Sequence, residues 1–334
     1  MSNILWVEKY RPKNVVDISH QVEVVKMLKH VLISGNMPHL LFYGPPGTGK
    51  TSAILALTRE LFGPNEYRNR ILELNASDER GINVVREKIK TWTRQIVQTN
   101  KNHEITGKQL PSWKVVILDE AEMMTSEAQS ALRRIIEMSA KNTRFVIICN
   151  YISKIIEPLA SRCAKFRFQP ISVKAQIERL KFISEKENIE YEDGLFDSIV
   201  NLTEGDLRRG ITILQSVSEL FGREQQIGVN SVVDIAGIPP NKVIERILKS
   251  CTVDGTESIL NESILVANEG WDVSSIIRLL AEFIIKNISL DDSKKAFIML
   301  KISEADIKIS DGSNEFLTIL SLLSSIQTIF VKKA

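Results

Sequence analysis

Near its N-terminus the chain carries a glycine-rich run of eight residues, Gly44-Pro45-Pro46-Gly47-Thr48-Gly49-Lys50-Thr51. The run fills every fixed position of a phosphate-binding loop, between an apolar, strand-like run at 39–43 and a helix-like pattern at 52–61. In such a loop, backbone N–H groups and the N-terminal end of the helix face the phosphates. Lys50 can reach the β- and γ-phosphates, and the Thr51 hydroxyl can hold Mg²⁺. A simple glycine turn is the weaker interpretation, so the run predicts a nucleotide site.

A second motif extends this prediction from binding to hydrolysis. The apolar run at 114–118 is typical of a strand buried in a parallel sheet, and it ends in Asp119 and Glu120. Carboxylates at the end of such a strand lie beside the phosphate loop in open α/β sheets. We therefore expect Asp119 to hold Mg²⁺ and Glu120 to orient or deprotonate the attacking water. Without the phosphate loop, the two acids would more simply mark a strand entering a solvated loop.

Composition narrows the class of protein without deciding it. The 334 residues are 43% hydrophobic and 25% charged, which is typical of a globular protein with two or three cores. No apolar run is long enough to span a bilayer, and residues 1–6 do not resemble a leader, so we expect an intracellular protein without a membrane partner. The three cysteines lack metal-ligand spacing and predict reduced thiols. A net charge of +2 does not by itself indicate nucleic-acid binding.

Hydrophobic periodicity predicts an α/β domain followed by helices. Strand-like and helix-like patterns alternate up to about residue 168, and from Val173 the pattern is almost wholly helical. Gly237-Ile238-Pro239-Pro240 interrupts the helices, because two prolines cannot continue one. We expect three domains: an α/β nucleotide-binding domain at 1–169, a helical lid at 170–237 and a helical collar at 238–334. The expected strands are 39–43, 70–76, 114–120, 143–150 and 164–169, and the expected helices are 19–35, 52–61, 82–97, 125–140, 173–188, 193–202, 206–221, 231–236, 273–287 and 315–332.

Short motifs occur along the chain in the order found in clamp-loader ATPases. They are Trp6-Val7-Glu8-Lys9-Tyr10-Arg11-Pro12, the phosphate loop, Leu74-Asn75-Ala76-Ser77-Asp78, Asp119-Glu120-Ala121-Glu122, Ile148-Cys149-Asn150, Ser161-Arg162-Cys163 and Gly205-Asp206-Leu207-Arg208-Arg209. The chain resembles the small subunits of replication factor C, the eukaryotic sliding-clamp loader, strongly from residue 4 to about 215 and only in helicity beyond. Residues 156–159 and the polar loop at 100–112 resemble the subunit in the fourth position of the pentamer.

The resemblance implies a fold, cofactors, partners and a location. The fold would be an AAA+ nucleotide-binding domain with a helical lid and a collar, and the cofactors ATP and Mg²⁺. The partners would be other replication factor C subunits in a hetero-pentamer, a sliding clamp of the PCNA type and primer-template DNA. The protein would load the clamp onto DNA in the nucleus, during replication and repair.

The same resemblance implies roles in binding the nucleotide. Val7 and Pro12 would pack against the adenine ring, while backbone groups of Tyr10 and Arg11 would read its edge. An apolar N-terminal arm that only packs on the core is the alternative.

Two further residues would sense the γ-phosphate. Asn150, the first sensor of the family, would position the attacking water, although an Asn in a strand-ending turn is as common. Arg208 would reach the γ-phosphate from the lid, with Arg209 as its rival.

Three more residues take roles from the resemblance. Arg162 would point away from its own site and complete the ATP site of a neighbouring subunit, although it also fits an ordinary surface arginine. Asn75 would hold the Glu120 carboxylate in an inactive position until DNA binds, or it is a plain strand-end cap. Glu122 stands where the family usually has Asp, and we expect little effect from this difference.

One predicted helix favours DNA binding. Arg86, Lys90 and Arg94 recur every fourth residue on one face, and Arg80 stands just before the helix. Such a row can follow a phosphate backbone without reading bases, although most basic helix faces are merely solvated. In the family, positions matching Arg80, Arg86 and Lys154 line the inner surface of a subunit spiral. The expected buried stripe, on another face of this helix, consists of Ile82, Val85, Ile89, Trp92 and Ile96.

Two other functions remain open at this point. A branch-migration helicase of the same ATPase superfamily would share the phosphate loop, the acids and the arginine, but would form a homo-hexamer. A structural subunit would bind ATP without hydrolysing it and lend Arg162 to a neighbour.

Overall fold

The computed structural model of this chain describes residues 4–18, 21–77, 82–95, 109–203, 205–221, 226–237, 239–253, 255–287 and 291–331. Arg80 and residues 100–108 of the expected polar loop lie outside these ranges. By its contacts the chain divides into two compact units. The first consists of residues 1–190 and 196–215, and the second of residues 191–195 and 216–334. The expected division into three domains at 169/170 and 237/238 stays a prediction.

The first unit contains a sheet of five parallel strands. Its order is β2-β3-β4-β1-β5, with β1 between β4 and β5. The strands are β1 (Leu40–Tyr43), β2 (Ile71–Asn75), β3 (Lys114–Asp119), β4 (Thr143–Cys149) and β5 (Ala164–Arg167). Each lies within a predicted strand. Because the strands are parallel, the segments that follow β1, β3 and β4 meet at one edge of the sheet, where ligands bind in open α/β sheets.

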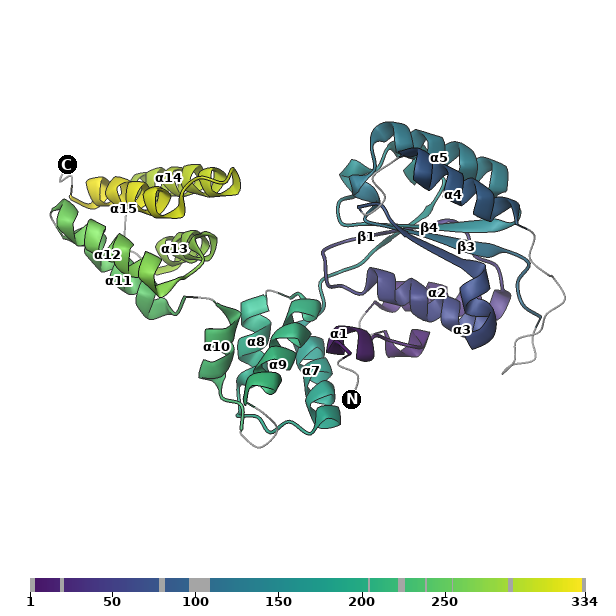
Figure 1. Cartoon of the computed structure of the whole chain (residues 1–334), viewed down its shortest axis with the longest axis horizontal. Helices are drawn as coiled ribbons and strands as arrows, with labels where there is room; N and C mark the ends of the chain where they lie inside the picture. The colour runs from purple at the N-terminus through teal and green to yellow at the C-terminus, as the bar shows by residue number, and fades with distance from the viewer. Residues whose placement is uncertain are drawn as a thin grey trace. The chain divides into compact units, whose positions relative to one another are not determined.

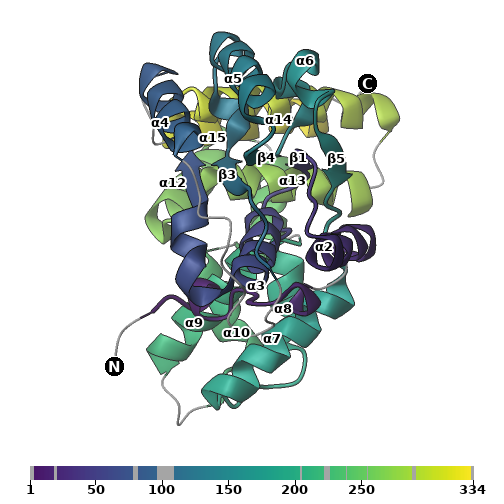
Figure 2. The same cartoon turned by 90° about the vertical axis from the view of Figure 1, so that its right-hand side faces the viewer.

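Helices cover both faces of this sheet (Figure 1). Leu40 and Phe42 pack in the core that contains α2 (Val22–Ser34) and α3 (Lys50–Arg70), whereas Leu41 packs in the core on the other face. This alternation follows from the two-residue period of a strand. Figure 2 shows the same layers after a quarter turn. The helices of the other face are α4 (Ile82–Arg94), α5 (Ser126–Ser139) and α6 (Glu157–Ala160).

Several elements depart from the predicted pattern. α3 is longer than the expected helix at 52–61, because a second segment continues beyond a break at Gly63, where φ is 73° and ψ is 168°. Pro64 then begins that segment, a position at which a helix needs no backbone N–H. Short elements that periodicity did not predict are α1 (Trp6–Lys9), α6, and the 3-10 helices η1 (Val15–Asp17), η2 (Ala121–Met123) and η3 (Ile152–Lys154).

Helices make up the rest of the described chain. Those that follow the sheet are α7 (Val173–Glu187), α8 (Leu195–Thr203) and α9 (Leu207–Phe221). Then come α10 (Val229–Ala236), α11 (Asn241–Thr252), α12 (Thr256–Glu269), α13 (Val273–Asn287), α14 (Asp292–Ser310) and α15 (Glu315–Val331). In the second unit, α11 to α15 share one core of mostly Ile, Leu and Val side chains. The described helices include none that is long and apolar enough to cross a bilayer.

Candidate functional site

A pocket in the first unit lies at the edge of the sheet where the phosphate loop begins α3. It gathers residues from four parts of the chain: the N-terminal arm, the phosphate loop, the ends of β3 and β4, and the helices after the sheet. Fourteen of the predicted site residues line it: Val7, Tyr10, Arg11, Pro12, Pro46, Gly47, Thr48, Gly49, Lys50, Thr51, Asp119, Glu120, Asn150 and Arg208. Lining residues to which the sequence analysis assigned no role are Asp17, Ile18, Ser52, Ile171, Arg179, Leu207 and Ile211.

Lys50 is the best-satisfied group of the phosphate loop. Its Nζ donates hydrogen bonds of 2.8 Å each to the carbonyl oxygens of Gly44 and Pro45 and to Oδ1 of Asn150. Its exposed fraction is only 8%, and burial lowers its pKa, while the nearby carboxylates of Asp119 and Glu122 oppose that shift. A bound phosphate would therefore replace existing partners of an ammonium group already aimed at the loop.

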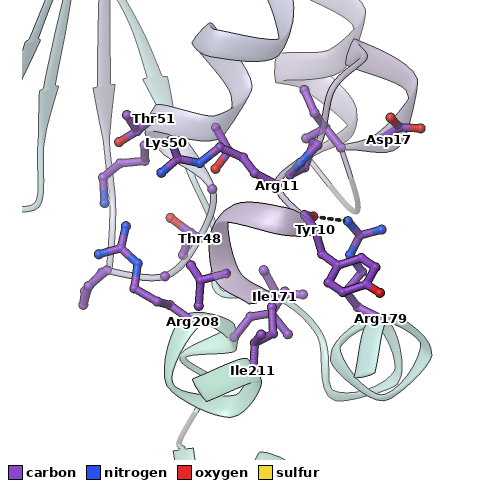
Figure 3. Close-up of a pocket in the computed structure, with 18 of the residues that line it drawn as sticks. Tyr10, Arg11, Asp17, Thr48, Lys50, Thr51, Ile171, Arg179, Arg208 and Ile211 are labelled. Carbon is purple, nitrogen blue, oxygen red and sulfur yellow. Dashed lines mark hydrogen bonds between the residues drawn. The ribbon is translucent and has the colours of Figure 1, made fainter. Parts of the chain in front are cut away.

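The phosphate loop touches the start of α9 directly. A Cβ atom built on Gly47, where φ is +72°, would come within 2.1 Å of Oδ1 of Asp206. The same Oδ1 accepts backbone hydrogen bonds from Arg208 at 2.9 Å and from Arg209 at 3.3 Å, and so caps α9. Of these two arginines, Arg208 lines the pocket. Figure 3 shows it reaching from α9 toward the loop, and its role as γ-phosphate sensor stays a prediction.

The two candidate Mg²⁺ ligands lie together. Thr51 Oγ1 donates a hydrogen bond of 2.7 Å to Oδ2 of Asp119. A hydroxyl and a carboxylate are the oxygen donors that Mg²⁺ prefers, so these residues fit the predicted metal.

Glu120 has an unusual backbone. Its φ is 53°, in the left-handed region that non-glycine residues seldom occupy, and its N–H donates to Oδ1 of Asp119 at 2.9 Å. Such a conformation costs about 1 to 3 kcal/mol and is common at active sites. Its position in the pocket, next to the candidate metal ligand Asp119, is the one expected of a residue that activates water.

The N-terminal arm is bonded to the helices that follow the sheet. The Tyr10 carbonyl accepts a hydrogen bond of 2.6 Å from Nη2 of Arg179 on α7, drawn as a dashed line in Figure 3. The Tyr10 hydroxyl donates at 2.6 Å to Glu187, which also forms an ion pair with Lys9. Burial, and then Glu187, raise the pKa of Tyr10. The backbone N–H of Trp6 donates a hydrogen bond of 2.8 Å to Oε1 of Gln215 on α9. An arm that contacts both α7 and α9 can transmit movement of these helices to the nucleotide site.

Arg162 is among the described residues that do not line this pocket. It follows α6, and its guanidinium forms an ion pair with Glu137 of α5 and donates to the Pro158 carbonyl at 2.6 Å. Arg133 donates to the same Glu137 oxygen at 3.3 Å. The side chain of Arg162 is 33% exposed, and its role at a neighbouring site stays a prediction.

The remaining predicted residues are more scattered. Asn75 Oδ1 accepts hydrogen bonds from the N–H and Oγ of Ser77 at 3.1 and 3.0 Å, so it caps the turn after β2, and its switch role stays a prediction. Lys90 on α4 forms an ion pair of 3.0 Å with Glu87, and Lys154 is exposed. Arg86 lies on α4, but its side chain is outside the described part of the chain, as is the whole of Arg80.

Known proteins resemble the chain over both its α/β and its C-terminal parts. Residues 40–171 match the family model described as "ATPase family associated with various cellular activities (AAA)", and residues 239–325 match "Replication factor C C-terminal domain". Replication factor C subunit 2 of Saccharomyces cerevisiae is 45% identical over 96% of this chain and 92% of its own length. Replication factor C subunit 4 of Homo sapiens is 47% identical over 96% of this chain and 87% of its own length.

Solved structures share the fold. The RuvB Holliday junction branch migration motor of Thermotoga maritima matches 71% of this chain and 79% of its own, with a TM-score of 0.52 at 18% identity. At that identity the likeness concerns the fold alone.

Proposed function

The chain belongs to the replication factor C family of small subunits and is an AAA ATPase, and on this premise we propose how it works as a clamp-loader subunit. It assembles with other replication factor C subunits into a hetero-pentamer, in which it takes the fourth position. ATP binding lets this assembly open a sliding clamp of the PCNA type, and hydrolysis lets the clamp close on primer-template DNA. The site of this work in the cell is the nucleus.

One observation carries this proposal beyond family membership. The pocket gathers Lys50, Thr51, Asp119 and Glu120, which are the groups needed to bind ATP and activate water, whereas Arg162 lies outside the pocket and is partly exposed. An arginine of this kind stabilises the charge of the transferring phosphoryl group when a neighbour supplies it. Such a division favours an assembly in which each subunit contributes to two sites.

The residues of the pocket divide the work on ATP. Backbone N–H groups of the phosphate loop hold the phosphates, and Lys50 exchanges its carbonyl partners for phosphate oxygens. Thr51 and Asp119 would hold Mg²⁺, which would offset the negative charge of the phosphates. Glu120 accepts the proton of the attacking water, and Asn150 orients that water.

The lid couples the nucleotide to the assembly. Arg208 reaches the γ-phosphate from α9, and the arm bonded to Arg179 and Glu187 encloses the adenine, so ATP binding draws these helices toward the phosphate loop. We place the α/β domain at 1–169, the lid at 170–237 and an oligomerising collar at 238–334. The family matches at 40–171 and 239–325 support the first and the third of these ranges.

Two alternatives are less well supported. The branch-migration helicase finds support only in the fold shared with RuvB at 18% identity, against about 45% identity over nearly the whole chain for replication factor C subunits. A subunit that binds ATP without hydrolysing it would need no water-activating acid, yet Glu120 lines the pocket.

Hydrolysis measured in mixtures tests the proposal. We expect the purified chain alone to hydrolyse ATP slowly, and a mixture with the partner subunits, primed DNA and a sliding clamp to hydrolyse it much faster. Primed DNA without the clamp, and the clamp without DNA, serve as controls. Rapid hydrolysis by the chain alone, indifferent to the clamp, would instead indicate a self-assembling motor.

DNA binding through α4 predicts a change in salt dependence. Replacing Arg80 and Arg86 by alanine is expected to weaken DNA binding and to reduce the slope of log K against log salt by about 0.9 for each DNA phosphate that the variant no longer neutralises. Lys90 should contribute less, because its ion pair with Glu87 already neutralises part of its charge. Lys29, exposed on α2, provides the control variant Lys29→Ala. A slope that does not change in the double variant contradicts this role.

A further inference from the structure

Glu122 makes an unexpected contact with Asn150. It lies in η2, three residues beyond Asp119, and it is not among the residues that line the pocket. Its Oε1 nevertheless accepts two hydrogen bonds from Asn150, one of 3.0 Å from the backbone N–H and one of 2.9 Å from Nδ2. A single carboxylate oxygen thus holds both the main chain and the side chain of the residue proposed to orient water.

This contact determines which end of the Asn150 amide faces the catalytic space. Because Nδ2 is bonded to Glu122, the amide oxygen Oδ1 points to the opposite side. There it accepts a hydrogen bond of 2.8 Å from Nζ of Lys50. A carboxylate only accepts hydrogen bonds and an ammonium only donates them. A flipped amide would place its oxygen against Glu122 and its NH₂ against Lys50, so both contacts would be repulsive. The two charges together permit one orientation.

We infer that Glu122 is a positioning residue, which fixes the Asn150 amide so that its oxygen can orient the attacking water. Glu122 itself does not line the pocket. The inference rests on the role proposed above for Asn150. It predicts that Glu122 affects the rate of hydrolysis much more than the affinity for ATP, because the bonds of Lys50 to Gly44 and Pro45 and of Thr51 to Asp119 do not involve Glu122.

The test is a double-mutant cycle in the assembled complex. The other hydrolysing subunits carry glutamine in place of their own water-activating glutamate, so that only this chain turns over ATP. Glu122→Ala, Asn150→Ala and the double variant are compared for kcat with DNA and clamp present, and for the Kd of a fluorescent ATP analogue. We expect Glu122→Ala to lower kcat about 10- to 100-fold, the range seen when a group that orients a metal ligand by a hydrogen bond is removed, with Kd changed less than about threefold.

The double variant separates the possible outcomes. If Glu122 acts through Asn150, Glu122→Ala has no further effect once Asn150 is alanine, whereas multiplying losses would overturn the inference. Glu122→Gln, which keeps the shape and one acceptor, should retain more activity than Glu122→Ala. Glu127→Ala, which removes an exposed acid nearby on α5, should leave kcat unchanged.

The double-mutant cycle also tests the role of Glu122 separately from the role proposed for Asn150. If Asn150→Ala lowers kcat while Glu122→Ala does not, the positioning role of Glu122 is wrong and the role of Asn150 stands. If Asn150→Ala leaves kcat unchanged, the role proposed for Asn150 is wrong, and the inference about Glu122 is overturned with it.

Discussion

Replacing Arg162 by alanine is expected to slow hydrolysis at the neighbouring ATP site of the assembled complex by about 10³- to 10⁵-fold. The loss is large because the guanidinium stabilises charge that develops only in the transition state. The affinity of this chain for ATP should not change, because Arg162 does not line the pocket that its own phosphate loop forms. The measurement pairs single-turnover hydrolysis in the complex with ATP binding to the isolated chain.

The structure supplies a matched control for this variant. Arg133 lies on α5, one helical turn before Glu137. It forms an ion pair of 3.3 Å with the Glu137 oxygen that also pairs with Arg162. Hydrogen bonds from Arg133 and Arg162 lower the pKa of Glu137. Arg133→Ala removes an ion pair from Glu137 and leaves Arg162 in place, and we expect hydrolysis within about threefold of the unmodified complex, since exposed ion pairs contribute little. Equal losses in the two variants, or loss of ATP binding in Arg162→Ala, would indicate a structural effect instead.

Most elements of the fold were predictable because their hydrophobic periods are long and regular. The strand at 114–120 was predicted to within one residue of β3, and the helix at 273–287 has the bounds of α13. The α/β class followed by helices is confirmed. The helices α11, α12 and α14 were expected only as parts of a wholly helical region, without bounds. The other elements that periodicity missed were short or interrupted. α6 has only four residues, too few to show a period, and the break at Gly63 concealed the second segment of α3.

The sequence predicted those parts of the site whose residues are consecutive in the chain. The phosphate loop and the pair Asp119-Glu120 are local motifs, so their chemistry follows from a few neighbouring positions. The contacts that organise the pocket join residues far apart: Asn150 and Glu122 are separated by 28 positions, and Tyr10 and Arg179 by 169. Such pairs depend on how the strands and helices pack, which no local pattern encodes. The sequence therefore indicated only that Glu122 stands where the family usually has Asp, a difference from which we expected little effect.

Replacing Glu120 by glutamine is expected to lower kcat about 10²- to 10⁴-fold while ATP binding persists. Glutamine has nearly the shape of glutamate, but its amide cannot accept the proton of the attacking water. Steady-state hydrolysis of the assembled complex and the Kd of a fluorescent ATP analogue measure the two quantities. A variant that loses ATP binding together with kcat would contradict a role confined to water activation.

The backbone conformation of Glu120 suggests a second variant, Glu120→Gly, for which stability is measured as well as hydrolysis. At a φ of 53°, glutamate is strained by about 1 to 3 kcal/mol, whereas glycine adopts this conformation freely. Glu120→Gly should therefore lose hydrolysis as Glu120→Gln does, yet unfold at a higher urea concentration than Glu120→Gln. Asn188→Gly is the control, because Asn188 ends α7 at a φ of 55° and asparagine tolerates the left-handed region better. Its gain should be smaller and its hydrolysis unchanged. If Glu120→Gly unfolds at a lower urea concentration than Glu120→Gln, the side chain at position 120 stabilises this turn. In that case the left-handed backbone of Glu120 is not a source of strain in the site.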